Sequence, residues 1–241
     1  MGTSSDRHAA VARPCSTLPK RGVEVRGLDF DVVVIGSGAG GGAAAHALAA
    51  AGRRVLVVER GRRWSDTEGG RDERRMLLER AAGDDRPLRL NGTPARLVTG
   101  GGVGGSTALY GAALLRPSPE DFRPGRWYGE RLPRGLWDWP VTLDELAPFH
   151  DWAEELFAVA GDAAQEIPHL ARRPLPYKAP LPPLAPANAR LAARLRAQGL
   201  APFALPLAID FARCLRCAAC PGYVCPNGAR ASSASAAIDP A

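Results

Sequence analysis

The pattern of apolar and polar residues changes several times along the chain, and it is most informative between residues 31 and 61. Two short, continuous runs of aliphatic residues, 32–35 and 55–58, predict strands that are buried on both faces of a parallel sheet. Between them, the alanine-rich stretch 43–51 predicts a helix that ends at Gly52. This order of strand, helix and strand predicts an α/β fold built on a parallel sheet.

Two further helices are predicted in the second half of the chain. Thr142 and Glu145 form a capping box at the start of a helix that continues to Gly161. Its apolar stripe consists of Leu146, Phe149, Ala153, Leu156, Phe157 and Ala160. A shorter amphipathic helix is expected over 188–198, where Gly199 stops it.

The same pattern divides the chain into regions. Residues 1–28 are polar and aperiodic, so we expect a loose N-terminal arm. The remainder, 29–241, is expected to form one α/β domain. Within that domain, residues 120–209 are expected to form a cap that includes a Pro-rich connection, and 210–241 are a Cys-rich segment.

A glycine-rich turn follows the first predicted strand directly and fits the pattern G-x-G-x-x-G. The residues of this turn are Gly36, Ser37, Gly38, Ala39, Gly40 and Gly41. Gly36 permits a tight turn, Gly38 lets a pyrophosphate approach the backbone, and Gly41 lets the helix pack against the strand. Glu59 ends the second predicted strand 18 residues after Gly41, where its carboxylate can bind ribose hydroxyls and would repel a 2′-phosphate. The element therefore predicts a site for FAD or NAD rather than NADP, although a glycine turn of another α/β protein is the alternative.

A second glycine-rich stretch covers residues 99–107. Such a density of glycine raises the entropic cost of folding, so a close approach of ligand to backbone is the expected compensation. A flexible linker is the alternative, but linkers are usually flanked by polar residues. Here the neighbours are apolar, which favours contact with a ligand that also touches the first turn.

Composition narrows the functional class. The 241 residues are 46% hydrophobic and carry a formal charge of +6, with an arginine excess that is scattered along the chain. Scattered arginines are typical of a solvated surface, and without a basic stripe we expect no nucleic-acid binding. We also expect no membrane span, since no apolar run approaches about 20 residues. The N-terminus lacks the apolar core of a secretory signal, so we expect a cytoplasmic location.

Four of the five cysteines are crowded into one segment with the spacing C-x2-C-x2-C-x4-C-P. The candidate metal ligands are Cys214, Cys217, Cys220 and Cys225. The spacing approaches an iron–sulfur run but has one extra residue in its last gap. An iron–sulfur cluster, tetrahedral zinc and a loop of buried thiols all remain open.

Taken in order, the motifs resemble the glucose–methanol–choline (GMC) family of FAD oxidoreductases, and its bacterial gluconate, glucose and long-chain alcohol dehydrogenase branch in particular. The matching pieces are DVVVIGSGAGGG, VVERG, GGVGGSTALYGAALLRPSPEDF, WDWPVTLDELAPFHDWAEELFAVAG and CPGYVCPNGARAS. They cover most of residues 31–241. The resemblance implies a Rossmann-like FAD-binding sheet with cap segments.

The resemblance also implies the roles of individual residues. The first glycine turn would hold the FAD pyrophosphate, and Glu59 the adenosine ribose. The second stretch would lie along the ribityl chain and isoalloxazine, with Tyr110 near the flavin in place of a residue that is often Asn or His. The residues implied on this side of the cofactor are Gly104, Gly105, Ser106, Thr107 and Tyr110, and Gly101 and Gly111 are further implied cofactor-binding residues. The Cys-rich version of the family also makes an iron–sulfur cluster a possible second cofactor.

The activity implied is oxidation of a CH–OH group of a small alcohol or sugar, in which a base takes the hydroxyl proton while hydride moves to flavin N5. The family's catalytic histidine and its C-terminal substrate domain lie beyond the region matched. The chain's own histidines are His8, His46, His150 and His169, and none fits the catalytic motif, so no catalytic residue is assigned.

Three other functions remain open. The chain can be a catalytically inactive flavin-binding fragment of a truncated gene, or one chain of a two-chain dehydrogenase whose partner supplies the catalytic half or accepts the electrons. A simple NAD-binding module is the third, and the second glycine stretch argues against it.

Overall fold

The computed structural model describes most of the chain. The described residues are 29–64, 69–83, 88–95, 99–133, 136–162, 164–165 and 176–241. The expected arm at 1–28 and much of the Pro-rich connection lie outside them.

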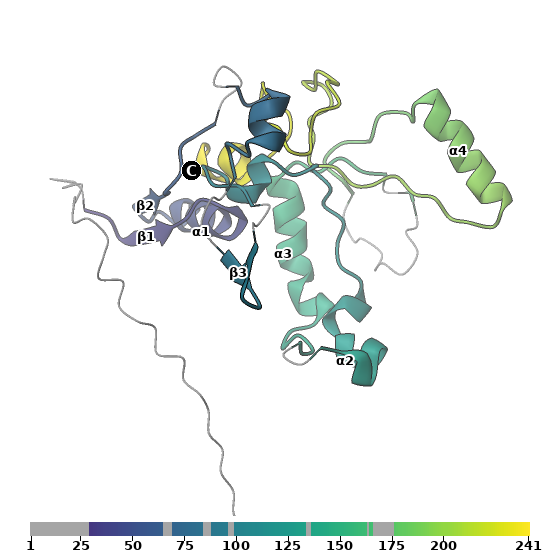
Figure 1. Ribbon diagram of the computed structural model, residues 1–241, viewed down its shortest axis with the longest axis horizontal. Helices are drawn as coiled ribbons and strands as arrows, with labels where there is room; N and C mark the ends of the chain where they lie inside the picture. The colour runs from purple at the N-terminus through teal and green to yellow at the C-terminus, as the bar shows by residue number, and fades with distance from the viewer. Residues whose placement is uncertain are drawn as a thin grey trace, which may run out of the picture.

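The predicted strand–helix–strand unit is present. Strands β1 (Val32–Ile35) and β2 (Val55–Val58) pair in parallel, with Val32 opposite Val55. Helix α1 (Ala39–Ala50) connects them, and Gly52 follows it with a φ of +76°. Figure 1 shows α1 lying against the two short strands. The fold is therefore mixed α/β with a parallel sheet.

The expectation that both faces of this sheet are buried is wrong. The side chains of Val33, Ile35 and Val58 are 55%, 87% and 46% exposed. Their face of the sheet is open because α1 covers only the opposite face, where Val34 lies close to Gly41. In the described part of the chain this sheet has only two strands.

The remaining elements are short, apart from two helices. In chain order they are η2 (Arg74–Leu78), β3 (Leu88–Leu90), β4 (Thr93–Ala95), η3 (Gly105–Ala108), η4 (Pro119–Phe122), α2 (Pro124–Tyr128), η5 (Gly129–Arg131), α3 (Leu143–Leu156), α4 (Pro186–Ala197) and η6 (Ser233–Ile238). Strands β3 and β4 form an antiparallel hairpin. Figure 1 shows α4 projecting away from the body of the protein at the end of two extended segments. None of the described helices is long and apolar enough to span a membrane.

Both predicted later helices form, with shifted ends. At the start of α3 the Thr142 hydroxyl accepts a hydrogen bond from the Glu145 N–H, and the Glu145 carboxylate accepts one from the Thr142 N–H. The helix ends at Leu156 rather than near Gly161, because the chain turns there into an extended segment. Phe149, expected in the apolar stripe, is 65% exposed. Helix α4 starts two residues earlier than expected and ends before Gly199.

The hydrophobic core is small and lies where segments distant in sequence cross. Its buried members are Ala112, Val159, Ala208 and Ile209. Isolated β-bridges hold the segments together at Ala113–Leu207, Ala160–Leu207, Ala160–Ala179 and Ile209–Arg230. The C-terminal segment is therefore part of the core rather than an appendage.

The C-terminal element η6 also reaches the glycine turn. It packs against both α1 and η3, and in Figure 1 the yellow C-terminal coil lies beside α1. This packing brings the start of η6 next to the first glycine turn, although almost the whole described chain lies between them in sequence.

Candidate functional site

A cavity of about 400 Å³ opens at the carboxyl ends of β1 and β2. Ligands of parallel α/β folds bind at this end of the sheet. The lining residues are Ile35, Gly36, Gly38, Val58, Glu59, Arg60, Thr99, Gly100, Gly102 and Gly105. The first glycine turn, Glu59 and the second glycine stretch thus share one cavity.

The first glycine turn needs glycine for two different reasons. Gly36 has a φ of +92°, which other residues rarely adopt. A Cβ at Gly41 would lie 1.9 Å from the Gly36 carbonyl oxygen, so glycine is needed there for helix and strand to pack. At Gly38, in contrast, a Cβ would meet no protein atom within 4 Å. The chain itself does not fill the space at Gly38, and that space faces the cavity.

Helix α1 presents an uncapped N-terminus to this cavity. Its N-cap is Gly38, which has no side chain to cap the helix, and its first turn contains no acidic residue. The N–H groups of the first turn and the positive end of the helix dipole are therefore available to an anion. Such an arrangement is suited to a pyrophosphate.

The second glycine stretch approaches other backbone segments very closely. A Cβ at Gly102 would lie 2.4 Å from the Arg62 carbonyl oxygen, and one at Gly105 would lie 2.9 Å from the Gly38 Cα. Part of the glycine density is therefore explained by chain packing rather than by a ligand. Gly100, Gly102 and Gly105 nevertheless line the cavity directly.

Glu59 is held in place by the first turn. Its Oε2 accepts hydrogen bonds from the Ser37 N–H at 2.9 Å and the Ser37 hydroxyl at 2.7 Å, and its Oε1 accepts one from the Gly61 N–H at 3.0 Å. Burial raises the pKa of Glu59, but hydrogen bonds from Ser37 and Gly61 outweigh it, so the pKa lies below its usual value. The carboxylate is a fixed negative charge at the edge of the cavity.

Several residues expected to contact the cofactor are not part of the cavity lining. These are Ser37, Ala39, Gly40, Gly41, Gly101, Gly104, Ser106, Thr107, Tyr110 and Gly111. Ser37 is only 1% exposed and serves the chain itself. The Tyr110 hydroxyl donates to the Ala231 carbonyl at 2.9 Å, and burial raises the pKa of Tyr110 to about 12.

Some lining residues were not singled out by sequence reasoning. Arg60 follows Glu59 and Thr99 begins the second glycine-rich stretch, while Ile35 and Val58 end the two strands, and none of the four was proposed as a site residue. The hydroxyl oxygen of Thr99 is buried and has no hydrogen-bond partner among the described residues. A buried hydroxyl without a partner is costly, so a ligand atom that binds it would relieve that cost. For these four lining residues, the signal in the sequence was their position at the end of a predicted strand or next to a glycine motif.

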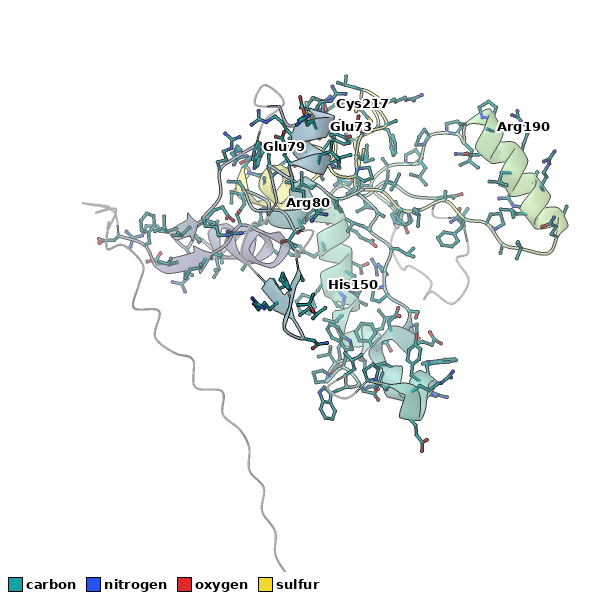
Figure 2. The ribbon with its side chains drawn as sticks, in the orientation of Figure 1. Glu73, Glu79, Arg80, His150, Arg190 and Cys217 are labelled. Atoms are coloured by element: carbon teal, nitrogen blue, oxygen red, sulfur yellow. The ribbon has the colours of Figure 1, made fainter. Side chains whose placement is uncertain are left out.

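The described histidines lie outside the cavity lining. His46 on α1 contacts the Ala237 carbonyl through Nδ1 at 3.3 Å and lies beside the Trp152 ring. Figure 2 labels His150 on α3, where its Nδ1 is buried and lacks a hydrogen-bond partner in the described residues. His8 and His169 fall outside the described residues.

The four clustered cysteines are free thiols in the structure. Within the described part of the chain, no group of three or more His, Cys, Asp or Glu side chains is placed to hold a metal ion. The Cys214 and Cys225 sulfurs accept backbone N–H groups at 3.4 Å and 3.3 Å, and Cys217 is exposed at the outer side of its loop (Figure 2). The iron–sulfur and zinc hypotheses therefore gain no support here.

Arg230 is a buried residue that sequence reasoning missed. The expectation that arginines are solvated is wrong for it, since it is 3% exposed. Its guanidinium donates to the carbonyls of Tyr110 and Tyr223 at 2.8 Å and also to those of Ala108 and Cys220. Burial lowers the pKa of Arg230. One side chain thus fastens the Cys-rich segment to the end of the second glycine stretch.

Comparison with known proteins decides which dinucleotide this cavity takes. Residues 31–68, which include the first turn, α1, β2 and Glu59, match the FAD binding domain family. The cofactor is FAD. The site's own features fit it: open space at Gly38, an uncapped helix N-terminus, an ionised Glu59 and an unpartnered Thr99 hydroxyl.

Similar curated proteins are oxidases and a dehydrogenase. The chain is 33% identical over 236 residues to 6'''-hydroxyparomomycin C oxidase of Streptomyces lividus, covering 93% of this chain and 41% of that protein. It is 34% identical over 248 residues to paromamine 6'-oxidase of Streptomyces fradiae, covering 98% and 43%. It is also 34% identical over 139 residues to 2-methyl-1,2-propanediol dehydrogenase of Mycolicibacterium austroafricanum, covering 54% and 25%. The chain thus spans about two fifths of the length of the first two relatives.

Proposed function

We propose that this chain is the FAD-binding part of a GMC-type oxidoreductase that acts on CH–OH groups of alcohols or sugars. One observation carries the proposal: the first glycine turn, Glu59 and the second glycine stretch line a single cavity at the carboxyl ends of β1 and β2. A dinucleotide such as FAD is long enough to touch all three. When bound, FAD supplies the hydride acceptor that the side chains themselves lack.

In this proposal each part of the chain has a binding role. The uncapped first turn of α1, Gly38 to Gly41, holds the pyrophosphate through backbone N–H groups. Glu59 binds ribose hydroxyls, and Thr99 lines the same cavity with its hydroxyl buried in the wall. The segment from Gly104 to Gly111 lies toward the flavin, with Tyr110 held rigid by its bond to Ala231.

The names of the relatives support the substrate class. Two relatives that match nearly the whole chain are named for oxidation of 6'''-hydroxyparomomycin C and of paromamine, and a third is named a propanediol dehydrogenase. We infer that the substrate is a hydroxyl group on a sugar-like or small alcohol molecule.

The catalytic base is proposed to come from elsewhere in the enzyme. No histidine of the described residues lines the cavity, and the relatives are more than twice as long as the matched region. We propose that a C-terminal catalytic half, on the same or a separate polypeptide, carries the base and closes over the flavin. General-base catalysis typically contributes about 10²- to 10⁴-fold.

Reconstitution tests the proposal. The purified 241-residue chain, incubated with FAD and desalted, should retain flavin absorbance, and an excess of NAD should not displace it. We expect negligible oxidation of alcohols and sugars until the C-terminal half of paromamine 6'-oxidase is co-expressed with it. Retention of NAD but not FAD would refute the site, and robust turnover by the chain alone would refute the external base. Flavin binding with no activity in any combination would favour an inactive flavin-binding protein.

A further inference from the structure

We propose that Ser233 is a positioning residue that sets the direction of the pyrophosphate-binding N–H groups. This inference rests on the proposed FAD site and deepens it. Ser233 belongs to η6 at the far end of the chain and is fully buried, with no exposed surface. The largest fully buried side chains among the described residues are those of Val159, Ser37 and Ser233, so two of the three carry a hydroxyl.

The Ser233 hydroxyl binds the first glycine turn from behind. Its Oγ lies 2.8 Å from the Ser37 carbonyl oxygen and 3.0 Å from the Gly38 carbonyl oxygen, both of which can accept its proton. The Gly38 carbonyl also accepts the first helical bond from the Gly42 N–H. Among the described residues, the Ser37 carbonyl has no donor other than Ser233.

The direction of these carbonyls fixes the N–H groups that follow them. In a trans peptide, the C=O and the next N–H point in opposite directions within one plane. The hydrogen bond from Ser233 to the Ser37 carbonyl therefore points the Gly38 N–H away from Ser233. In the same way, its hydrogen bond to the Gly38 carbonyl points the Ala39 N–H away from Ser233. These are N–H groups at the start of α1, where an anion binds.

Ser233 also connects the first turn to the second glycine stretch. Its backbone N–H donates to the Thr107 hydroxyl at 2.8 Å, and that hydroxyl donates to the Gly104 carbonyl. The Gly104 N–H in turn donates to the Ser37 hydroxyl at 3.0 Å, which donates to Glu59. The hydrogen bonds form a closed circuit through both glycine loops, and Ser233 is its only member outside them and Glu59.

The packing around Ser233 leaves room for its hydroxyl to contact the first glycine turn. A Cβ at Gly42 would lie 1.8 Å from the Ser233 Oγ, so the helix must carry glycine there to admit the hydroxyl. Gly42 lies one residue beyond the G-x-G-x-x-G pattern, and pyrophosphate binding does not account for it. A Cβ at Gly104 would lie 3.2 Å from the Ala234 Cβ, a tight contact but not an overlap of this kind.

The test compares Ser233→Ala with Ser235→Ala. Ser235 is the matched control because it lies in the same element and its hydrogen bonds are with Ser232 only. Two quantities are measured for each variant: hydrogen–deuterium exchange of a peptide covering 36–42 in the cofactor-free protein, and the Kd for FAD by fluorescence quenching well below the unfolding temperature.

We expect Ser233→Ala to speed exchange of the 36–42 peptide and to weaken FAD binding about 10-fold, the usual effect of losing one buried donor. Ser235→Ala should change neither quantity, and Ser233→Cys, which keeps a weak donor, should fall between wild type and Ser233→Ala. If Ser233→Ala does not fold, Ser233→Cys is compared with wild type instead. Faster exchange and weaker FAD binding in Ser233→Cys would then support the inference, and unchanged values would overturn it.

The inference would be overturned if Ser233→Ala and Ser235→Ala showed equal exchange of the 36–42 peptide and equal affinity for FAD. It would also be overturned if Ser233→Ala lowered the unfolding temperature but left the Kd for FAD and the exchange of this peptide unchanged. Failure of the wild-type chain to bind FAD would instead refute the proposed site, while the exchange comparison would still decide whether Ser233 orders the turn.

Discussion

At the scale of single residues, glycines that look alike in the sequence have different reasons to be glycine. Gly41 and Gly42 make room for other parts of the chain, whereas the space beside Gly38 is open and faces the cavity. Only the last kind reports on a ligand. Gly38 is therefore the residue whose substitution separates binding from folding.

We predict that Gly38→Val abolishes FAD binding with little loss of stability. A Cβ at this position meets no protein atom within 4 Å, and the added side chain would occupy the space that the pyrophosphate needs. Gly40→Ala is the control and should still bind FAD, because the proposed contact of Gly40 is its backbone N–H, which alanine keeps, and a Cβ there meets no protein atom and lies outside the cavity lining. Flavin absorbance after desalting and the urea midpoint would be measured for both. A folded Gly38→Val protein with wild-type affinity would show that the site is misplaced.

Arg230 shows the opposite case, a charged residue whose role is structural. Its guanidinium is the donor to four backbone carbonyls, and its Nε is buried with no partner in the described residues. A buried carbonyl left without a donor costs about 1–3 kcal/mol. Its removal should therefore affect stability rather than specificity.

We predict that Arg230→Met lowers the free energy of unfolding by about 3 kcal/mol or more, as several carbonyls lose their donor together. Arg230→Lys should be intermediate, because an ammonium reaches fewer of the four carbonyls. Arg190→Met on the projecting α4 (Figure 2) is the control and should change stability by less than about 0.5 kcal/mol. Urea unfolding measures all three, and equal values for Arg230→Met and Arg190→Met would contradict the structural role.

At the scale of elements, the sequence was most informative where the signal is local. The aliphatic runs of β1 and β2, the alanine-rich α1 and the Thr142 capping box are all encoded within a few residues of one another. The contacts of Ser233 with Gly38 and of Arg230 with Tyr110 join residues 195 and 120 positions apart. No periodicity or spacing encodes such contacts, because they depend on how the completed segments cross.

Helix α3 is held by a partly buried ionic group that its sequence pattern did not reveal. Arg116 donates to Glu154 at 2.7 Å and 2.8 Å and to Asp151 at 2.5 Å. The hydrogen bonds that Arg116 donates to Glu154 raise the pKa of Arg116. His150 lies beside this group, and its pKa is lowered, first by burial and then by the Arg116 charge, against the opposite effect of Glu154 and Asp151.

We predict that His150 makes the protein sensitive to mild acid. Its pKa in the folded state lies below the unfolded value of 6.5, so the unfolded state takes up its proton first as pH falls. The contribution of neutral His150 is complete above pH 6.5 and is lost as pH falls through the folded pKa. Wild-type stability should therefore drop more between pH 7 and pH 5 than that of His150→Gln, which has no proton to bind. Parallel urea midpoints for the two proteins across this range would exclude His150 as the cause.

At the scale of the whole molecule, the parallel sheet has one covered and one open face. Parallel sheets are normally covered on both faces, yet Val33 and Ile35 are 55% and 87% exposed on the face opposite α1. The sequence predicted burial on both faces because successive side chains of a strand point to opposite faces, so a continuous aliphatic run indicates an apolar environment on each face. The described part of the chain supplies one of these, and the proposed C-terminal half would supply the other.

Neighbouring residues of β1 allow a direct test of this asymmetry. Val34 lies against Gly41 under α1, whereas Val33 faces the open side and does not line the cavity. We predict that Val34→Thr lowers the free energy of unfolding by about 1 kcal/mol, since it places a hydroxyl in an apolar contact. Val33→Thr should leave stability within about 0.5 kcal/mol of wild type, because more than half of the Val33 side chain is already exposed to water. It should also reduce binding of a hydrophobic dye and aggregation, because exposed apolar patches promote both. Equal losses of stability in the two variants would mean that the open face is already covered in the isolated protein. If only Val34→Thr loses stability in the isolated chain, the two variants are then compared with the C-terminal half co-expressed. A loss of stability in Val33→Thr under that condition would identify the C-terminal half as the missing cover.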